Sequence, residues 1–290
     1  MSSEALEYAS SCFLPTSWMA LPLVNRKEYN YDTTVYTFGL PEGKSLELPV
    51  CACLLLKAPG KGRKEGGGKD DFDGSDAVRP YTPTSSNEML GAFELMVKRY
   101  DGGAVSQYLF GLKPGEDSVE FKHIKFNVKS QYPFDGKKSF TMLAAGSGIT
   151  PMYQALHKIM STPGDDRKVT LIYGNKSAED VLLKDEIDAW AKQQPDRLKV
   201  IHVVGTTPDA PLSDDAQEKL SPLAATLKPG WVDEAKIKEF AFAPSDDTMI
   251  FVCGLPPMYN ILCGPRTEKE VAEGTVLQKL GYTKDMVSKM

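Results

Sequence analysis

The sequence lacks the features that mark several large classes of protein. It has no apolar run of 18 residues, so no transmembrane helix is expected. Its most apolar early stretch, residues 12–24, is short and contains two prolines, and no basic segment precedes it, which argues against a signal peptide. Three scattered histidines show no metal-ligand spacing, so no metal site is predicted. Five cysteines without a CxxC pair predict reduced thiols in an intracellular protein.

The chain also has a negative net charge, because its 39 Asp and Glu residues outnumber its 34 Lys and Arg residues. Binding to a phosphate backbone normally requires a basic surface, so no nucleic-acid partner is expected. The remaining composition, 41% hydrophobic and 25% charged, is that of an ordinary globular protein. A chain of 290 residues is long enough for two domains with separate cores.

The first half of the chain predicts a small antiparallel β-barrel over residues 21–133, after a flexible tail at 1–20. Short runs of β-forming residues alternate with turns, which is typical of such barrels. Strands are expected at 21–24, 33–38, 48–57, 92–100, 119–122 and 124–128, and a short helix at 105–110. Cys51 and Cys53 are expected on the third strand. Residues 58–77, rich in glycine and charge, are expected to form a disordered loop between two paired strands.

The second half, residues 134–290, alternates strands with helices after a boundary at Tyr132-Pro133. Strands are expected at 140–145, 168–173, 198–204 and 248–252, and helices at 151–160, 184–193, 231–240 and from Tyr259. This order predicts an α/β domain with a parallel sheet and right-handed crossovers. Ligands of such sheets bind beyond the carboxyl ends of the strands.

Residues 79–85 (RPYTPTS) place a cation, an aromatic ring and several hydroxyls on a backbone stiffened by two prolines. Each proline fixes its own φ and favours an extended conformation in the residue before it. A guanidinium is a rigid fork of donors suited to phosphate, and a tyrosine has a flat face. Arg79 and Tyr81 therefore suit a ligand that carries both a pyrophosphate and a flat ring. An ordinary strand-end turn with a surface arginine is the alternative.

A second motif, residues 145–151 (AGSGITP), stands directly between a predicted strand and a predicted helix. Its glycines would let a ligand approach the backbone closely. Thr150 is expected to be the N-cap and Pro151 the first helical residue, so the helix start would face an anion. A proline stands where the Rossmann fingerprint has its third glycine. A purely structural joint is the alternative.

A third motif, residues 253–258 (CGLPPM), follows another apolar strand. A cysteine at the carboxyl end of a strand would put a polarisable sulfur at the ligand cleft in a fixed place. A buried structural thiol is the alternative. No histidine has a sequence context that supports nucleophilic chemistry at Cys253.

Four motifs, taken in order, resemble the NADH–cytochrome b5 reductase family, within the wider ferredoxin–NADP reductase-like flavoenzymes. They are RPYTP (79–83), GGAVSQYL (102–109), AGSGITPM (145–152) and CGLPPM (253–258). The resemblance covers roughly residues 20–290. It implies an FAD-binding barrel followed by an NADH-binding α/β domain. It also implies hydride transfer from NADH to the flavin and then single-electron transfers to a haem protein such as cytochrome b5.

The resemblance assigns roles to individual residues. Arg79 would contact the FAD pyrophosphate, and Tyr81 the flavin and its ribityl chain. Thr82 at the reactive edge of the flavin and Cys253 over the nicotinamide are the candidate catalytic residues, and Thr150 would contact the flavin. The other residues implied to bind FAD are Pro80, Met96, Lys98, Tyr100, Gly103, Ala104, Val105 and Ser106. Those implied to bind NADH are Gly146, Ser147, Gly148, Pro151, Gly254, Pro256 and Met258.

The sequence departs from the family pattern in five places. Ala104 and Val105 replace a Lys-Met pair, residues 122–126 replace a Gly-Pro-x-Gly segment, and residues 51–53 replace Gly-Gln-His. Met290 replaces a terminal phenylalanine, and Gly205 stands where an aspartate often favours NADH. No arginine near Gly205 could receive a 2′-phosphate, so NADH is still expected. The form of 122–126 is similar to mitochondrial members, so a cytoplasmic or a mitochondrial location is expected.

An acidic acceptor such as cytochrome b5 would need a basic docking face. Candidate residues for this face are Lys98, Arg99, Lys113, Lys122 and Lys125. An ordinary mixture of solvated charges is the alternative, and a monomer is expected. Two other functions stay open: a general flavin or ferric reductase or diaphorase, and a non-enzymatic module that has lost FAD.

Overall fold

The computed structural model describes residues 12–124 and 130–290. The chain divides into two compact units between Gln131 and Tyr132, close to the boundary expected after Pro133. Among the described residues, no helix combines the length and the hydropathy that a bilayer crossing needs.

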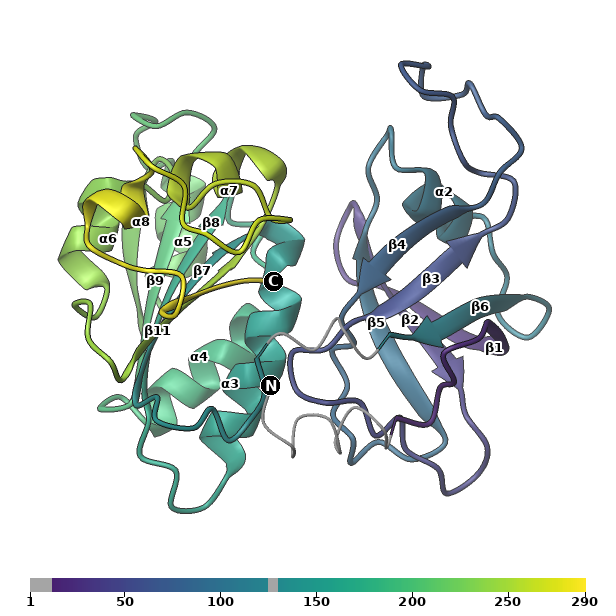
Figure 1. Ribbon diagram of the computed structural model, residues 1–290, viewed down its shortest axis with the longest axis horizontal. Coiled ribbons are helices and arrows are strands. Elements are labelled where there is room, and N and C mark those ends of the chain that lie inside the picture. Colours follow the sequence, from purple (N-terminus) through teal and green to yellow (C-terminus); the bar gives the residue numbers. More distant parts are fainter. Residues whose placement is uncertain (1–11, 125–129) are drawn as a thin grey trace. The chain divides into compact units, whose positions relative to one another are not determined.

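The first unit is a curled antiparallel sheet (Figure 1), as the sequence predicts. Its strands are β1 (Met19–Glu28), β2 (Thr33–Gly39), β3 (Leu54–Ala58), β4 (Ala77–Tyr81), β5 (Ala92–Lys98) and β6 (Ser118–His123), in spatial order β4-β3-β6-β1-β2-β5. The backbone N–H of Thr84 donates to the carbonyl of Glu94 at 2.9 Å, which ties the segment after β4 to β5 at the other end of this order. The short helix α2 (Ala104–Phe110) follows β5, as predicted.

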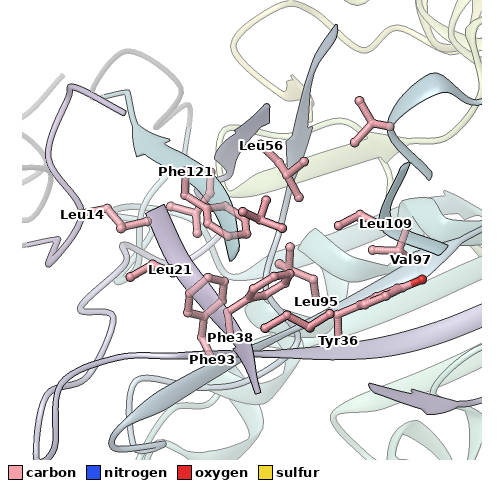
Figure 2. Close-up of a cluster of buried hydrophobic side chains, with 14 of the residues drawn as sticks. Leu14, Leu21, Tyr36, Phe38, Leu56, Phe93, Leu95, Val97, Leu109 and Phe121 are labelled. Atoms are coloured by element: carbon pink, nitrogen blue, oxygen red, sulfur yellow. The ribbon is translucent and has the colours of Figure 1, made fainter. Parts of the chain in front are cut away.

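Three phenylalanines from different strands form the centre of the first unit's core (Figure 2). Phe38, Phe93 and Phe121 come from β2, β5 and β6 and are at most 1% exposed. Their ring centroids lie between 4.7 and 5.6 Å apart, and Phe121 meets the other two edge-on. Such pairs add about 0.5–1.5 kcal/mol each beyond the burial of their surface. The core therefore holds the strands that carry the motif residues.

Two sequence expectations for the amino-terminal part are wrong. Residues 12–20 are not a loose tail, because Leu14 is 2% exposed and the N–H of Phe13 donates to Leu46 at 2.9 Å. The earlier part of the expected tail, residues 1–11, lies outside the described residues. Cys51 and Cys53 do not lie on a strand, because Cys51 sits in a turn with a φ of 63° and β3 begins only at Leu54.

The charged loop between β3 and β4 is an ordered hairpin, not the expected disordered segment. The two strands pair as predicted, and the N–H of Gly62 donates to Ser75 at 2.7 Å. Backbone hydrogen bonds join the two halves of the loop, since the N–H of Lys64 donates to Asp71 at 3.1 Å and the N–H of Asp73 donates to Gly62 at 3.1 Å. Lys64 pairs with Asp71 at 2.8 Å across the hairpin.

The expected strand at 119–122 is confirmed as part of β6, but the one at 124–128 is not. Ile124 has no strand conformation, and residues 125–129 lie outside the described part of the chain.

The second unit is a parallel six-stranded sheet with crossover helices (Figure 1), as predicted. Its strands are β7 (Ser139–Ala145), β8 (Lys168–Asn175), β9 (Leu198–Val204), β10 (Ala225–Pro229), β11 (Thr248–Cys253) and β12 (Val287–Lys289), in spatial order β10-β9-β8-β7-β11-β12. Its helices are α3 (Ile149–Ser161), α4 (Lys184–Gln193), α5 (Asp214–Leu220), α6 (Glu234–Phe240), α7 (Pro256–Leu262) and α8 (Val276–Lys279). Side chains of α6, α7 and α8 share one buried cluster with the sheet.

Sequence patterns missed the edge strands β10 and β12 and the short helices α5 and α8. The predicted helix at 231–240 begins later, at Glu234, because the side chain of Asp233 caps it by accepting from the N–H of Lys236 at 2.9 Å. The edge strands are too short, at five and three residues, to show a periodic pattern.

Candidate functional site

The second unit brings two of the sequence motifs together at the carboxyl edge of its sheet. β7 ends at Ala145 and β11 ends at Cys253, and the two strands pair in parallel with Ala144 opposite Cys253. The glycine turn after β7 and the Cys-Gly segment after β11 therefore lie side by side, although more than 100 residues separate them in the chain.

These two segments pack backbone against backbone because both contain glycine at the contact. A Cβ atom on Gly148 would overlap the carbonyl of Cys253 and would lie 2.9 Å from the N of Gly254. A Cβ atom on Gly254 would lie 2.6 Å from the sulfur of Met258 and 3.2 Å from the Cβ of Ala145. A side chain at Gly148 would push the segments apart, whereas one at Gly254 would first displace the Met258 side chain. The glycines thus determine how closely the two segments approach at the carboxyl edge of the sheet.

The start of α3 differs from the sequence prediction. Gly146–Gly148 form one turn of 3-10 helix that runs directly into α3, so the helix begins at Ile149 with Gly148 as the N-cap residue. Thr150 is therefore the second helical residue, and Pro151 is the third. The hydroxyl of Thr150 donates to the carbonyl of Ser147 at 3.3 Å, which stabilises the turn from within.

Tyr173, on β8, holds the glycine turn through a hydrogen bond, and none of the sequence motifs includes it. Its hydroxyl donates to the carbonyl of Gly146 at 3.0 Å and accepts from the N–H of Leu182 at 3.2 Å. The side chain is fully buried. A second buried tyrosine, Tyr259 on α7, has its hydroxyl beside Cys253. Both were missed because a tyrosine within an apolar element looks like an ordinary core residue.

Asn175, the last residue of β8, is a buried polar side chain at the same edge of the sheet. It is 9% exposed, and neither its amide nitrogen nor its amide oxygen has a hydrogen-bond partner among the described residues. Leaving a buried polar group unpaired costs about 1–3 kcal/mol. This orphaned amide fits a ligand that supplies both a donor and an acceptor. Its place two residues after a predicted strand is a signal that could have identified it.

Gly205 follows β9 and lies in a position with no room for a side chain. A Cβ atom there would lie 2.9 Å from the Cα of Gly230 and 3.0 Å from the Cβ of Ala210. The N–H of Gly205 donates to the carbonyl of Asn175 at 3.1 Å. The backbone packing around residue 205 therefore explains why no acidic side chain stands there.

In the first unit, Arg79, Pro80 and Tyr81 are the last three residues of β4, which confirms the extended conformation that the prolines predict. The Arg79 guanidinium is exposed, donates to the carbonyl of Val78 at 2.8 Å and makes no ion pair within the described residues. Burial raises the pKa of Tyr81, although the nearby Arg79 charge opposes this effect. The Tyr81 phenol therefore stays protonated beside an available cation.

The loop before α2 lies in the same part of the first unit. Helix α2 packs against β3 and β4, and Tyr81, Ala104 and Val105 belong to one apolar cluster. The hydroxyl of Ser106 donates to the carbonyl of Gly103 at 3.1 Å and accepts from the N–H of Tyr100 at 3.2 Å. The two FAD motifs that the sequence separates by about 20 residues are thus neighbours in the fold.

Other residues predicted to bind FAD are spread along and beyond β5. Met96 is buried, and Tyr100 is 40% exposed. Lys98 forms an ion pair with Asp32 at 2.8 Å, in which the two side chains are 15% and 16% exposed. Its charge is therefore largely matched within the first unit.

The described residues of the candidate basic docking face have local partners. The Arg99 guanidinium lies 4.1 Å from the ring centroid of Phe110, and the Lys122 ammonium lies 4.5 Å from that of Trp18. Lys113 pairs with Glu116 at 3.4 Å, and Lys125 lies outside the described residues. β5 and β6 are separated in the sheet order by β1 and β2. These contacts leave the positive charges in place, so the docking face stays a prediction.

Comparison with known proteins agrees with both units. Residues 20–127 match the oxidoreductase FAD-binding domain family, and residues 142–264 match the oxidoreductase NAD-binding domain family. NADH-cytochrome b5 reductase 2 of Saccharomyces cerevisiae is 36% identical over 277 residues, which cover 94% of this chain and 82% of that protein. The protein of the same name from Kluyveromyces lactis is 34% identical over 284 residues, which cover 97% and 86%.

Among solved structures, the cytochrome b5 reductase domain of Ulva prolifera nitrate reductase is similar over both units. It superposes with a TM-score of 0.75 at 28% identity, covering 97% of this chain and 100% of that one. With an FAD-binding domain followed by an NAD-binding domain, the chain belongs to the NADH-cytochrome b5 reductase family.

Proposed function

We propose that this protein passes a hydride from NADH to FAD and then single electrons to a haem protein such as cytochrome b5. Relatives named NADH-cytochrome b5 reductase 2 support this proposal. The observation that carries it is the carboxyl edge of the second unit, where two glycine segments pack backbone to backbone beside Cys253. Bound FAD supplies the chemistry that links a hydride donor to a one-electron acceptor.

The residues of the first unit fit FAD. Arg79 presents a guanidinium with no internal ion pair among the described residues, and this group suits the pyrophosphate. Tyr81 supplies a half-buried ring for the flavin and its ribityl chain, and Thr82 directly after it supplies a hydroxyl for the reactive edge. At Gly103 a side chain would collide with Ser106, so glycine lets this loop pack closely against the start of α2. Because Ala104 replaces the family lysine and carries no charge, Arg79 provides positive charge for the pyrophosphate.

The residues of the second unit fit the nicotinamide nucleotide. Gly146 and Gly148 carry no side chain at this edge, and Cys253 and Gly254 form the wall beside them. The unpaired amide of Asn175 provides a donor and an acceptor for the nucleotide. Pro256 and Met258, in the first turn of α7, hold this wall in place. The chain thus orients the nucleotide through backbone shape and a few fixed polar groups.

The first test is the visible spectrum of the holoprotein, recorded anaerobically before and after adding NADH. A flavin band that bleaches with NADH is the expected result, and a band that stays unchanged would contradict the proposal. Steady-state rates with cytochrome b5, free FMN and ferricyanide then test the acceptor. We expect cytochrome b5 to be reduced efficiently. Selective reduction of free FMN would instead identify a general flavin reductase.

The state of assembly and the compartment stay predictions. A monomer is expected, and light scattering of the FAD-loaded protein would test it. A cytoplasmic or mitochondrial location is expected, and imaging of the tagged full-length protein in its own cells would distinguish the two.

A further inference from the structure

Arg63, in the charged hairpin between β3 and β4, reaches the loop that leads into α2. A Cβ atom on Gly102 would lie 3.9 Å from Nη1 of Arg63, so the guanidinium lies directly beside the backbone of this loop. The hairpin extends from the ends of β3 and β4, the two strands against which α2 packs (Figure 1). Arg63 therefore adds a cation to the part of the first unit that contains the motifs 79–83 and 102–109.

The hairpin fixes the position of Arg63 through contacts between its two halves. Arg63 forms an antiparallel bridge with Phe72, and its Cζ lies 6.0 Å from the centroid of the Phe72 ring, close enough for a cation–π contact. On either side of this bridge, the N–H of Lys64 donates to Asp71 and the N–H of Asp73 donates to Gly62. These contacts hold Arg63 in place and leave its charge unneutralised.

The guanidinium of Arg63 is available to an anionic ligand. Its Nε is buried and has no hydrogen-bond partner among the described residues, an unfavourable state for a donor. The neighbouring carboxylates have other partners, because Asp71 pairs with Lys64 at 2.8 Å and Asp76 with Lys57 at 3.8 Å. Since a guanidinium is a rigid fork of donors that matches phosphate oxygens, this side chain suits a phosphate at the Gly102 loop.

The direction of β4 indicates which half of FAD Arg63 would meet. Tyr81, which suits the flavin, is the last residue of β4, and Arg79, which suits the pyrophosphate, stands two residues earlier. Farther back along the strand the chain leads into the hairpin, where the N–H of Gly62 donates to Ser75 and continues the pairing of the two strands. Arg63 therefore lies beyond Arg79 on the side away from Tyr81, where the AMP half of FAD is expected.

We propose that Arg63 is a further cofactor-binding residue, which donates to the phosphate in the AMP half of FAD. It supplies a second cation at a site where Ala104 has replaced the family lysine. The inference rests on FAD binding in the proposed function. It assigns the hairpin of residues 59–76 a function, which is to carry this arginine to the Gly102 loop.

The test compares Arg63→Ala with Lys61→Ala in titrations of the full-length apoprotein with FAD, followed by flavin fluorescence. Lys61 is a matched control, because it is a cation of the same hairpin and its Nζ lies 5.1 Å from the centroid of the same Phe72 ring. We expect Arg63→Ala to raise the Kd for FAD about tenfold, as the loss of a charge-assisted hydrogen bond would. Lys61→Ala should change it less than about twofold, because a charge that does not touch the ligand is screened.

FMN distinguishes the two halves of the cofactor, because it contains the flavin, the ribityl chain and one phosphate but no AMP. Titrated in the same way, it should bind Arg63→Ala and the wild type with the same Kd. Thermal melting of the apoproteins shows whether the hairpin still holds the fold, and equal melting temperatures are expected. Arg63→Lys keeps the charge and loses the fork, so its Kd for FAD should lie between those of the wild type and Arg63→Ala.

Four results would each overturn the inference: unchanged FAD affinity in Arg63→Ala, an equal loss in Lys61→Ala, an equal loss of FMN affinity, or a lower melting temperature in Arg63→Ala alone. The last would assign the loss of FAD to the structure of the hairpin. A wild-type protein that binds no FAD would end the proposed function as well. A wild type that binds FAD no more tightly than Arg63→Ala would refute only the role of Arg63.

Discussion

The two units build their candidate sites in opposite ways. In the first unit, the site depends on exposed or half-buried side chains at a strand end, above all Arg79 and Tyr81. In the second unit, it depends on the absence of side chains, because Gly148 and Gly254 let two backbones touch. A site of the first kind should be damaged by removing atoms, and one of the second kind by adding them. The following predictions test this difference, from the largest expected effect to the smallest.

Adding one methyl group to the second unit should have the largest effect. In Gly148→Ala the new Cβ would overlap the Cys253 carbonyl, although Gly148 has an ordinary φ of −64°. We expect NADH-driven flavin reduction to fall on the order of 100-fold, because displacement of the wall misaligns the nucleotide. Overpacking should also lower the free energy of unfolding by about 1–3 kcal/mol. Stopped-flow absorbance and thermal melting would measure the two effects.

The matched control is Gly68→Ala in the hairpin loop of the first unit, where a Cβ would meet no atom within 4 Å. It should leave the rate of flavin reduction unchanged. A Gly148→Ala protein that reduces flavin at the wild-type rate would show that the backbone contact does not shape the site.

Removing atoms from the first unit should instead affect cofactor affinity. Arg79→Ala is expected to weaken FAD binding by about 10- to 100-fold, since a hydrogen bond to a charged group contributes about 1.5–3 kcal/mol. Turnover at saturating FAD should change much less. Titration of the apoprotein with FAD, followed by flavin fluorescence, would measure the affinity. Lys44→Ala removes an exposed cation elsewhere in the same unit, and equal losses in both variants would argue against a specific role for Arg79.

Acid should destabilise the second unit through His202. Burial lowers the pKa of this histidine to about 4, against 6.5 for an ordinary side chain. Protonation therefore favours the unfolded chain, so the stabilisation is present above pH 6.5 and is lost as the pH falls toward 4. Between pH 7.5 and pH 5 the loss should be about 2 kcal/mol. Urea unfolding at both pH values would measure it, and His202→Gln should lose most of this dependence.

The smallest effect should come from the orphaned amide at the edge of β8. Asn175→Ala is expected to weaken NADH binding by about 3- to 10-fold, in line with the net value of neutral hydrogen bonds. Its stability without NADH should change less than in Asn87→Ala, because the Asn87 amide donates to Leu48 at 2.9 Å and accepts from it at 3.1 Å. Calorimetric titration and thermal melting would separate the two effects. Unchanged NADH affinity would remove Asn175 from the site.

The elements that the sequence predicted well are those with local signals. An apolar strand followed by glycine and then an amphipathic helix indicated β7 and α3, and prolines indicated the extended end of β4. Composition gave the wrong prediction for the loop of residues 58–77, because backbone hydrogen bonds between its two halves form a hairpin that composition does not encode. The prediction was also wrong for Cys51, which lies in a turn with a φ of 63° and not on a strand.

By itself, the sequence determined the order of the longer strands and helices and the chemistry carried by each motif, because periodicity, turns and residue types are local properties. Only the tertiary structure decided which motifs meet. Pairing of β7 with β11 places the glycine turn against Cys253, and the hydroxyl of Tyr259 joins α7 to the backbone oxygen of Met290. Such contacts depend on register and packing between distant segments. No pattern within one segment contains that information.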